Sequence, residues 1–253
     1  MTVLTRLWDH VSASQPAPPA WVVGVTALAA LLLVLNTASW RLAGKVITIA
    51  HEGGHALVSV LSGRRLEGIR LHADSSGVTY SRGKRRGPGL VLTAAAGYLT
   101  PSLLGAGAAA LLAARHPVAL LWLALVLLAA TFLAVRNVFG ALAVLVTAGG
   151  VFAVSYYASA AVQAGFAYLA AWFLLLGGMR PALELTRRRY ARARAGLRPG
   201  YGAGAGPRSG AGSGLTDADQ LARLTGLPRG AWVTVFILVA TAALALGARL
   251  LIP

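Results

Sequence analysis

Two histidines and a glutamate stand close together in the run His51-Glu52-Gly53-Gly54-His55. In a helix, residues four positions apart project from the same face, so the rings of His51 and His55 can bind one metal ion. Glu52 would lie beside them, where its carboxylate can take a proton from a water on the metal. This spacing is typical of zinc sites that hydrolyse peptide bonds.

The metal ligands must come from a narrow set of residue types. The chain has no cysteine, which excludes a disulfide scaffold and thiolate metal sites. Two alternatives to a metal site stay open for the motif: a hydrogen-bonded packing cluster between helices, and a proton or ion relay in a transporter. Zinc is favoured because the histidine spacing suits it and because it gives Glu52 a defined task.

The composition is that of a membrane protein. Of the 253 residues, 57% are hydrophobic and only 12% are charged, whereas soluble proteins carry about 25% charged residues. We therefore expect one integral-membrane, metallopeptidase-like domain over residues 1–253. Histidine and glutamate inside an apolar span are costly unless they are paired or bound to a metal, which strengthens the zinc hypothesis.

Seven apolar stretches have about the 20 residues that a membrane-spanning helix needs. They are residues 21–40, 42–61, 90–114, 118–135, 138–156, 160–179 and 232–252. The sequence thus predicts an all-α polytopic membrane protein with about seven transmembrane helices, the second of which carries the histidine motif.

The net charge is +16. We interpret the basic clusters between the apolar stretches as signals that orient the chain in a lipid bilayer, and not as a surface that binds nucleic acid. With seven spans, the basic clusters within 64–86 and 180–208 fall on one side, which the positive-inside rule makes cytoplasmic. The same parity makes residues 1–20 a cytoplasmic tail and puts the C-terminus outside. Because the composition resembles that of GC-rich bacteria, we expect a multi-pass protein of a bacterial-type inner (plasma) membrane.

Two regions between the spans are predicted to be non-helical. Residues 66–81, in the basic loop 63–87, have short β-prone runs around a Gly/Ser/Asp turn and predict a small β-hairpin between the second and third helices. Residues 196–214, in the basic cytoplasmic segment 180–230, form a Gly-rich linker. A short helix is expected to follow from Thr216.

The chain resembles the site-2 protease family of intramembrane zinc metallopeptidases, in particular its compact bacterial branch. The resemblance is clearest over residues 49–105 and weaker over 216–228; the runs that carry it are 51–55, 62–65, 71–78 and 96–101. It implies cleavage of membrane-protein or signal-peptide-like substrates within the bilayer. His51 and His55 would hold Zn²⁺, and Glu52 would be the general base.

The chain departs from this family at the third zinc ligand. Typical members carry an Asn-x-x-Pro…Leu-Asp-Gly motif, whereas this chain has Asn137-Val138-Phe139-Gly140 and no following aspartate. Among the seven acidic residues, we predict Asp217 as the third ligand, with Asp74 and Asp219 as alternatives. Asp217 also has a simpler interpretation as part of a helix cap.

Two further hypotheses follow from these motifs. Asn137 is predicted to bind the substrate by donating a hydrogen bond to its carbonyl, with helix capping as its alternative role. The protein as a whole is predicted to be a zinc metalloendopeptidase in which Glu52 activates the water. The alternative function is a non-proteolytic membrane scaffold, or an ion or proton transporter, that retains a degenerate motif.

Overall fold

The computed structural model describes residues 13–194 and 215–252 of the chain. The predicted Gly-rich linker 196–214 and most of the predicted N-terminal tail lie outside these residues. The helices are α2 (Ala20–Leu35), α3 (Thr37–Leu61), α4 (Pro88–Ala113), α5 (Pro117–Ala134), α6 (Val138–Tyr157), α7 (Ala160–Arg194), α8 (Asp217–Thr225) and α9 (Arg229–Leu251), and the strands are β1 (Arg65–Leu71) and β2 (Gly77–Arg82).

Among the described residues, the five helices α4, α5, α6, α7 and α9 are long and apolar enough to cross a membrane. Helices α2 and α3 meet these criteria only together, as a pair bent by 101°. The helical membrane architecture with a small hairpin is confirmed, but there are five or six candidate spans instead of about seven. The difference arises because α2 ends after 16 residues, about 24 Å of helix.

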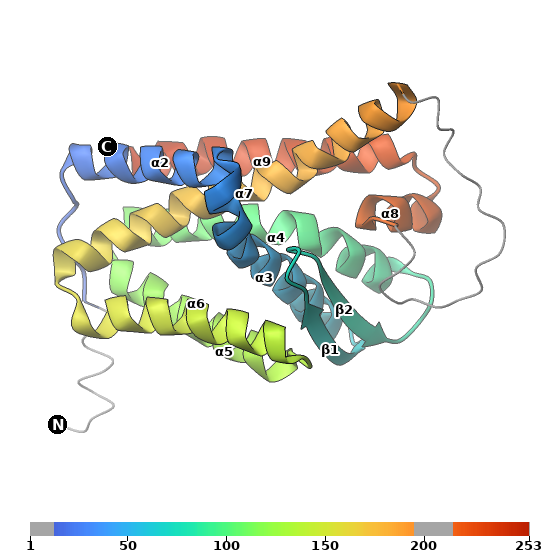
Figure 1. Ribbon diagram of the computed structural model, residues 1–253, viewed down its shortest axis with the longest axis horizontal. Coiled ribbons are helices and arrows are strands. Elements are labelled where there is room, and N and C mark those ends of the chain that lie inside the picture. Colours follow the sequence, from blue (N-terminus) through green and yellow to red (C-terminus); the bar gives the residue numbers. More distant parts are fainter. Residues whose placement is uncertain (1–12, 195–214, 253) are drawn as a thin grey trace.

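The bend between α2 and α3 is stabilised on both sides. The side chain of Asn36 accepts hydrogen bonds from the backbone N–H groups two and three residues further on, and so caps the start of α3. From α7, the guanidinium of Arg180 donates to the backbone carbonyl of Val34 and lies 4.4 Å from the ring centroid of Trp40. These contacts satisfy backbone groups that the break leaves unpaired, so α3 can run obliquely through the bundle (Figure 1).

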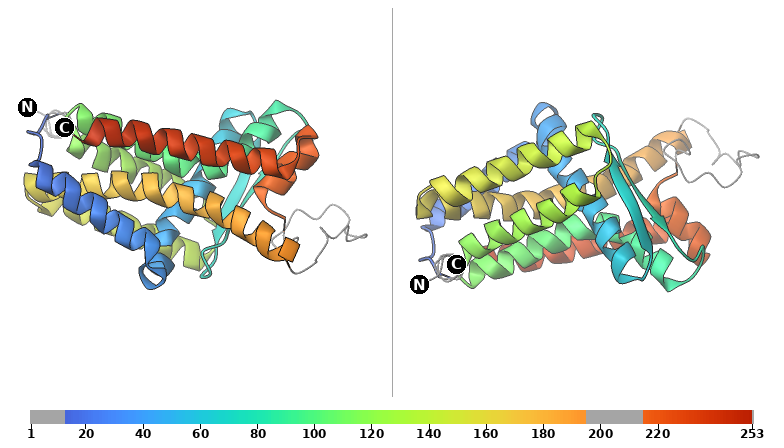
Figure 2. Two further views of the ribbon diagram at one scale, coloured as in Figure 1. Left: turned by 90° about the horizontal axis from the view of Figure 1, so that it is seen from above. Right: turned by 90° about the horizontal axis from the view of Figure 1, so that it is seen from below.

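The start of α2 and the end of α9 lie at one end of the bundle, and the hairpin and α8 lie at the other (Figures 1 and 2). The N–H of Gln15 donates to the carbonyl of Arg115 (2.9 Å), and its side-chain amide donates to Gln163 (3.3 Å). We expected the tail to share a side with the basic loop. In the structure, residues 13–20 lie at the opposite end of the bundle from the hairpin, and the side of the membrane that they face stays a prediction.

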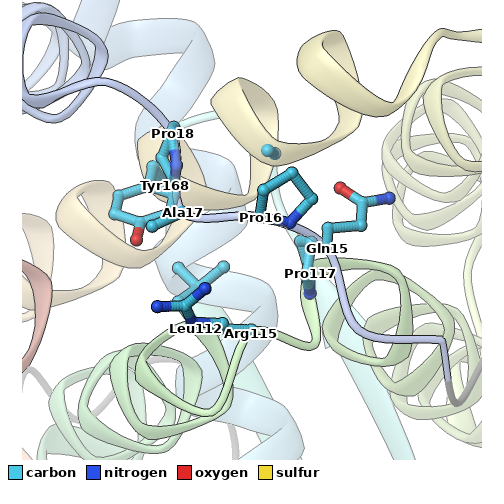
Figure 3. A pocket seen from close by; sticks show the side chains of 9 residues that line it. Gln15, Pro16, Ala17, Pro18, Leu112, Arg115, Pro117 and Tyr168 are labelled. Carbon is cyan, nitrogen blue, oxygen red and sulfur yellow. The ribbon is translucent and has the colours of Figure 1, made fainter.

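A small pocket lies at this same end, between the segment that precedes α2 and the helices α4 and α7 (Figure 3). Its volume is about 10 Å³, which is room for roughly one water molecule. The pocket is at the opposite end of the bundle from the hairpin and α8, so it has no part in the chemistry of the histidine motif.

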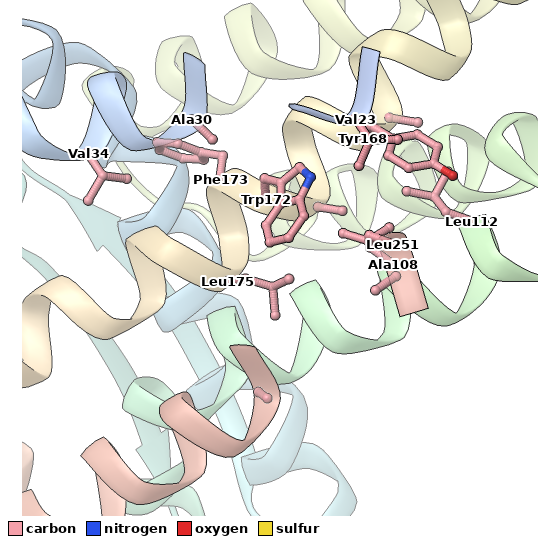
Figure 4. Packing of buried hydrophobic residues seen from close by; sticks show 14 of the residues in the cluster. Val23, Ala30, Val34, Ala108, Leu112, Tyr168, Trp172, Phe173, Leu175 and Leu251 are labelled. Atoms are coloured by element: carbon pink, nitrogen blue, oxygen red, sulfur yellow. The ribbon is translucent and has the colours of Figure 1, made fainter. Parts of the chain in front are cut away.

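Helix α7 lies at the centre of the largest hydrophobic core (Figure 4). Its buried residues Tyr168, Trp172 and Leu175 share this core with residues of α2, α4 and α9. A Cβ atom at Gly105 of α4 or at Gly247 of α9 would clash with Leu175. Small residues therefore let these helices approach closely, which is how helices associate within a membrane.

The predicted hairpin is present. Strands β1 and β2 pair antiparallel, with Leu71 opposite Gly77 next to the turn. In the turn, the N–H of His72 donates to the carbonyl of Ser76 (2.8 Å), while Asp74 Oδ1 accepts from the N–H and the hydroxyl of Ser76 (3.0 and 2.6 Å). An aspartate that bonds two residues ahead is typical of tight turns, so local sequence alone specifies this feature.

Strand β1 is the inner strand of the hairpin. On the side away from β2, its Ile69 forms a parallel bridge with Val135 and accepts a hydrogen bond from the N–H of Arg136 (2.8 Å). The turn between α5 and α6 thus holds β1 against the bundle. In the part of the chain that the structure describes, β2 pairs with β1 alone, so β2 is an edge strand.

Candidate metal centre

The histidine motif lies in the second half of α3. Glu52 and His55 are buried, with 4% and 8% of their surface exposed, and His51 is half-buried. The rings of His51 and His55 lie on the same face of the helix, with their centroids 4.7 Å apart. The helical spacing therefore brings the two imidazoles together as the sequence predicts.

Asp217, the first residue of α8, faces this pair. Its Oδ2 atom lies 3.1 Å from Nε2 of His51 and 3.2 Å from Nε2 of His55, and the two Nε2 atoms are 3.2 Å apart. Ligand atoms about 2.0–2.1 Å from a tetrahedral zinc lie about 3.3 Å from one another, so the three atoms fit three corners of such a site. Among the described residues, these three form the one acidic and histidine group that could hold a metal ion.

The ring of His55 is oriented by a backbone group of α4. Its Nδ1 atom lies 2.6 Å from the carbonyl oxygen of Thr93. A carbonyl can only accept, so Nδ1 carries the proton and donates. In the neutral ring the lone pair is then on Nε2, which faces Asp217 and His51. A hydrogen bond from the other ring nitrogen to a carbonyl fixes the tautomer and orientation of a metal-binding histidine.

Helix α8 begins with a capping box in which the side chain of Asp217 takes no part. The hydroxyl of Thr216 accepts from the N–H of Asp219 (3.4 Å), and Asp219 Oδ2 accepts from the N–H (2.9 Å) and the hydroxyl (2.7 Å) of Thr216. Asp219 Oδ1 also lies 3.2 Å from Nε of Arg229. Capping is thus carried out by Thr216 and Asp219, so the simpler interpretation of Asp217 as a cap does not account for its position.

Helix α8 is held in place by packing. Its Ala218 and Leu221 are fully buried, in a cluster with residues of α4, α7 and α9 that includes Phe236. At its other end, the indole N–H of Trp232 donates to the hydroxyl of Thr225 (3.0 Å). The carboxylate of Asp217 is therefore positioned by α8 and its contacts with the bundle.

The environment keeps the Asp217 carboxyl ionised. Burial by itself raises its pKa, but His55 and His51 outweigh this effect and hold the pKa of Asp217 below its usual range. An ionised carboxylate is the form that binds a metal. Asp74 lies in the exposed hairpin turn with Ser76, and Asp219 belongs to the capping box, so neither alternative ligand joins the group.

Two glycines allow α3 and α4 to approach at the site. A Cβ atom at Gly97 of α4 would clash with Nε2 of both His51 and His55. Gly54, inside the motif, packs against Thr100 in the same way. The contact of Gly97 with the histidines was missed, although Gly97 lies in the run 96–101 that carries the family resemblance.

An aromatic side chain lines the site next to His51. The ring of Tyr98 on α4 lies edge-on to that of His51, with centroids 4.9 Å apart, and stacks on Phe236 of α9 at 4.8 Å. Since Phe236 is fully buried, this stack connects the ring of His51 to the rigid core.

Glu52 contacts strand β2, which was also missed. Its Oε2 atom lies 2.6 Å from the hydroxyl of Thr79, and its backbone carbonyl lies 3.1 Å from the same hydroxyl. Gly77 approaches the Glu52 side chain so closely that a Cβ atom there would lie 2.7 Å from Oε1. The hairpin is therefore part of the surroundings of the motif.

Asn137 is engaged with the backbone of β1. Its side-chain amide donates to the carbonyl of Leu71 (2.7 Å), and its Oδ1 accepts from the N–H of Leu71 (3.1 Å). Its side chain makes no capping bond to α6, so the alternative role in capping is incorrect. Since the amide nitrogen carries two N–H donors, the predicted hydrogen bond from Asn137 to a substrate carbonyl stays a prediction.

Comparison with known proteins adds one finding. A family model described as Peptidase M50B-like matches residues 24–247 of the chain. No curated protein and no solved structure matches it significantly. The matched region contains the histidine motif, the hairpin and Asp217, so every part of the candidate site lies within it.

Proposed function

The chain belongs to the Peptidase M50B-like family, and we propose that it is an intramembrane zinc metalloprotease that cleaves membrane-embedded substrates. The observation that carries this proposal is the meeting of His51, His55 and Asp217, whose ligand atoms all lie within 4.8 Å of one another. Ionisable groups among apolar helices are costly unless they share a partner. A metal ion bound by all three accounts for their convergence.

Each residue of the site has a role in this proposal. His51, His55 and Asp217 hold the metal. When bound, zinc lowers the pKa of a water molecule and polarises the carbonyl of the scissile bond. Glu52 takes the proton of the water and passes it to the leaving amine.

The hairpin offers a place for the substrate. The peptide bonds of a helix are covered by their own hydrogen bonds, so a membrane-protein or signal-peptide-like substrate must unwind before it is cut. An extended segment could then add to the edge strand β2. An open cavity of about 400 Å³ lies beside this strand, lined by His72, Asp74, Ser76, Gly77 and Val78. Gly77 borders the cavity and also contacts Glu52, which supports entry from this side.

We place the basic end of the bundle in the cytoplasm of a bacterial-type inner membrane. The residues at the hairpin end are strongly basic; they are Arg64, Arg65, Arg70, Arg82, Lys84, Arg85 and Arg86. The turn between α6 and α7 at the opposite end carries no charge. The positive-inside rule favours this orientation, and it puts residues 13–20 on the outer side.

Metal analysis and cleavage together test the proposal. Protein purified in detergent micelles is expected to contain one zinc per chain and to cleave fluorescently labelled casein, an unfolded protein that needs no unwinding. Glu52→Gln should keep the zinc and lose cleavage, because only the base is removed. His51→Ala should lose the zinc. Glu67→Gln, at a surface carboxylate paired with Arg82, serves as the matched control and should behave as wild type.

The same experiment separates the proposal from its rivals. A non-proteolytic scaffold, or a transporter with a degenerate motif, would show zinc without cleavage by the wild type. Absence of zinc from the wild type, or full activity of Glu52→Gln, would contradict the protease hypothesis.

A further inference from the structure

Strand β2 contacts the side chain of Glu52 through two of its residues. Gly77 and Thr79 are two positions apart, so they lie on the same face of the strand. On that face, the Thr79 hydroxyl lies 2.6 Å from Glu52 Oε2. Atoms of the Glu52 side chain lie 2.6–2.8 Å from where a Cβ atom of Gly77 would stand. We call these two residues the seat of Glu52.

Both residues of the seat are suited to this contact by their chemistry. A carboxylate only accepts hydrogen bonds, so the Thr79 hydroxyl acts as the donor toward Oε2. Gly77 is not among the glycines with positive φ. Its backbone would therefore tolerate a side chain, and the reason for glycine is the space that Glu52 occupies. Since Glu52 is 4% exposed, protein contacts, and not solvent, determine the orientation of its carboxylate.

We infer that Thr79 and Gly77 are positioning residues for the general base. This inference rests on the proposed function, in which Glu52 moves the proton. The Thr79 hydroxyl holds one oxygen of the carboxylate, and Gly77 provides the room for the side chain to lie against β2. Because β2 is also the edge strand, the surface available to an extended substrate and the orientation of the base belong to the same element.

The test uses the full-length, zinc-loaded protein in detergent micelles with labelled casein as the substrate. Thr79→Val keeps the shape of the side chain and removes the donor. It should lower kcat about 10- to 100-fold, the size of effect expected from a small misplacement of a catalytic group. KM and zinc content should stay unchanged. Thr79→Ser restores the hydroxyl and should restore kcat. Thr147→Val, whose hydroxyl bonds only within α6, is the matched control.

A second variant removes the space instead of the donor. Gly77→Ala should also lower kcat with zinc retained, because its methyl group displaces the Glu52 carboxylate. Wild-type kcat in both Thr79→Val and Gly77→Ala would overturn the inference. So would a Thr79→Ser variant as slow as Thr79→Val, since the effect would then not come from the hydroxyl.

The contact between Thr79 and Glu52 can also be measured without activity. In thermal unfolding of the zinc-free protein, the Tm changes of Glu52→Leu and Thr79→Val should not add in the double variant, because each substitution removes one partner of the same bond. Additive changes would overturn the inference even if the protein cleaves casein. If the wild type does not cleave casein, the proposed function fails, while this cycle still decides whether the seat exists.

Discussion

Nε2 of His55 and Oδ2 of Asp217 lie 3.2 Å apart, although 162 positions separate the two residues in the chain. One turn of α4 connects the elements that carry them. The carbonyl of Thr93 binds Nδ1 of His55, and the next two residues, Ala94 and Ala95, belong to the cluster that buries α8. The same short stretch of α4 therefore orients one ligand and supports the helix that carries another.

Replacement of Asp217 by asparagine should weaken zinc binding by at least about 100-fold. The change keeps the shape of the side chain but removes the charge that binds the metal, and loss of an outer-shell partner alone costs about 10- to 100-fold. Competition with a chromophoric chelator measures the affinity. Asp74→Asn is the control and should match wild type; the reverse result would assign the third ligand to Asp74.

Replacement of Gly97 by alanine should abolish zinc binding and leave the fold intact. The methyl group would occupy the space next to Nε2 of His51 and His55 and force the rings apart. Gly107→Ala is the matched control on the same helix, because a Cβ atom there meets nothing within 4 Å. Zinc content and Tm should be measured for both. A Gly97→Ala protein with full zinc would show that α4 can shift at no cost.

Replacement of Asp219 by alanine should lower the affinity for zinc about 10-fold, the lower range of outer-shell effects. The variant loses the capping box with Thr216 and the ion pair with Arg229, so the first turn of α8, which carries Asp217, loosens. Arg223→Ala, at an exposed position of the same helix, should have no effect. Wild-type affinity in Asp219→Ala would mean that hydrophobic packing alone fixes α8.

The membrane topology can be tested with single cysteines, because the chain has none of its own. In intact spheroplasts, a membrane-impermeant maleimide should label Ser14→Cys and Ile252→Cys, both at exposed positions. It should label Lys84→Cys, at the basic end, only after lysis. The first two sites are next to the start of α2 and the end of α9, and the third follows β2; these elements lie at opposite ends of the bundle. Protection of Ser14→Cys together with labelling of Ile252→Cys would instead support seven crossings.

Features that depend on neighbours in the sequence were predicted correctly. The pairing of His51 and His55 follows from the helical repeat, and the hairpin follows from its turn residues. Five of the seven apolar stretches correspond to helices that are long and apolar enough to cross a membrane by themselves. The small number of acidic residues directed attention to Asp217 even though no local motif marks it.

The features that were missed depend on contacts between distant segments. Two consecutive apolar stretches look the same in sequence whether each crosses the membrane or both form one bent pair. Here the bend between α2 and α3 is stabilised by Arg180, which lies on α7, far away in the chain. Gly97, Thr79 and Gly77 matter only because α4 and β2 pack against α3.

The sequence by itself determined a helical membrane protein with two histidines and a glutamate on one helix, since these properties follow from composition and a local repeat. Tertiary structure decided which carboxylate joins the histidines, because that depends on how α8 packs on α4, α7 and α9. It also decided that Asn137 binds the backbone of Leu71 and that β2 contacts Glu52. Packing between segments far apart in the chain sets these relationships, and no local pattern encodes them.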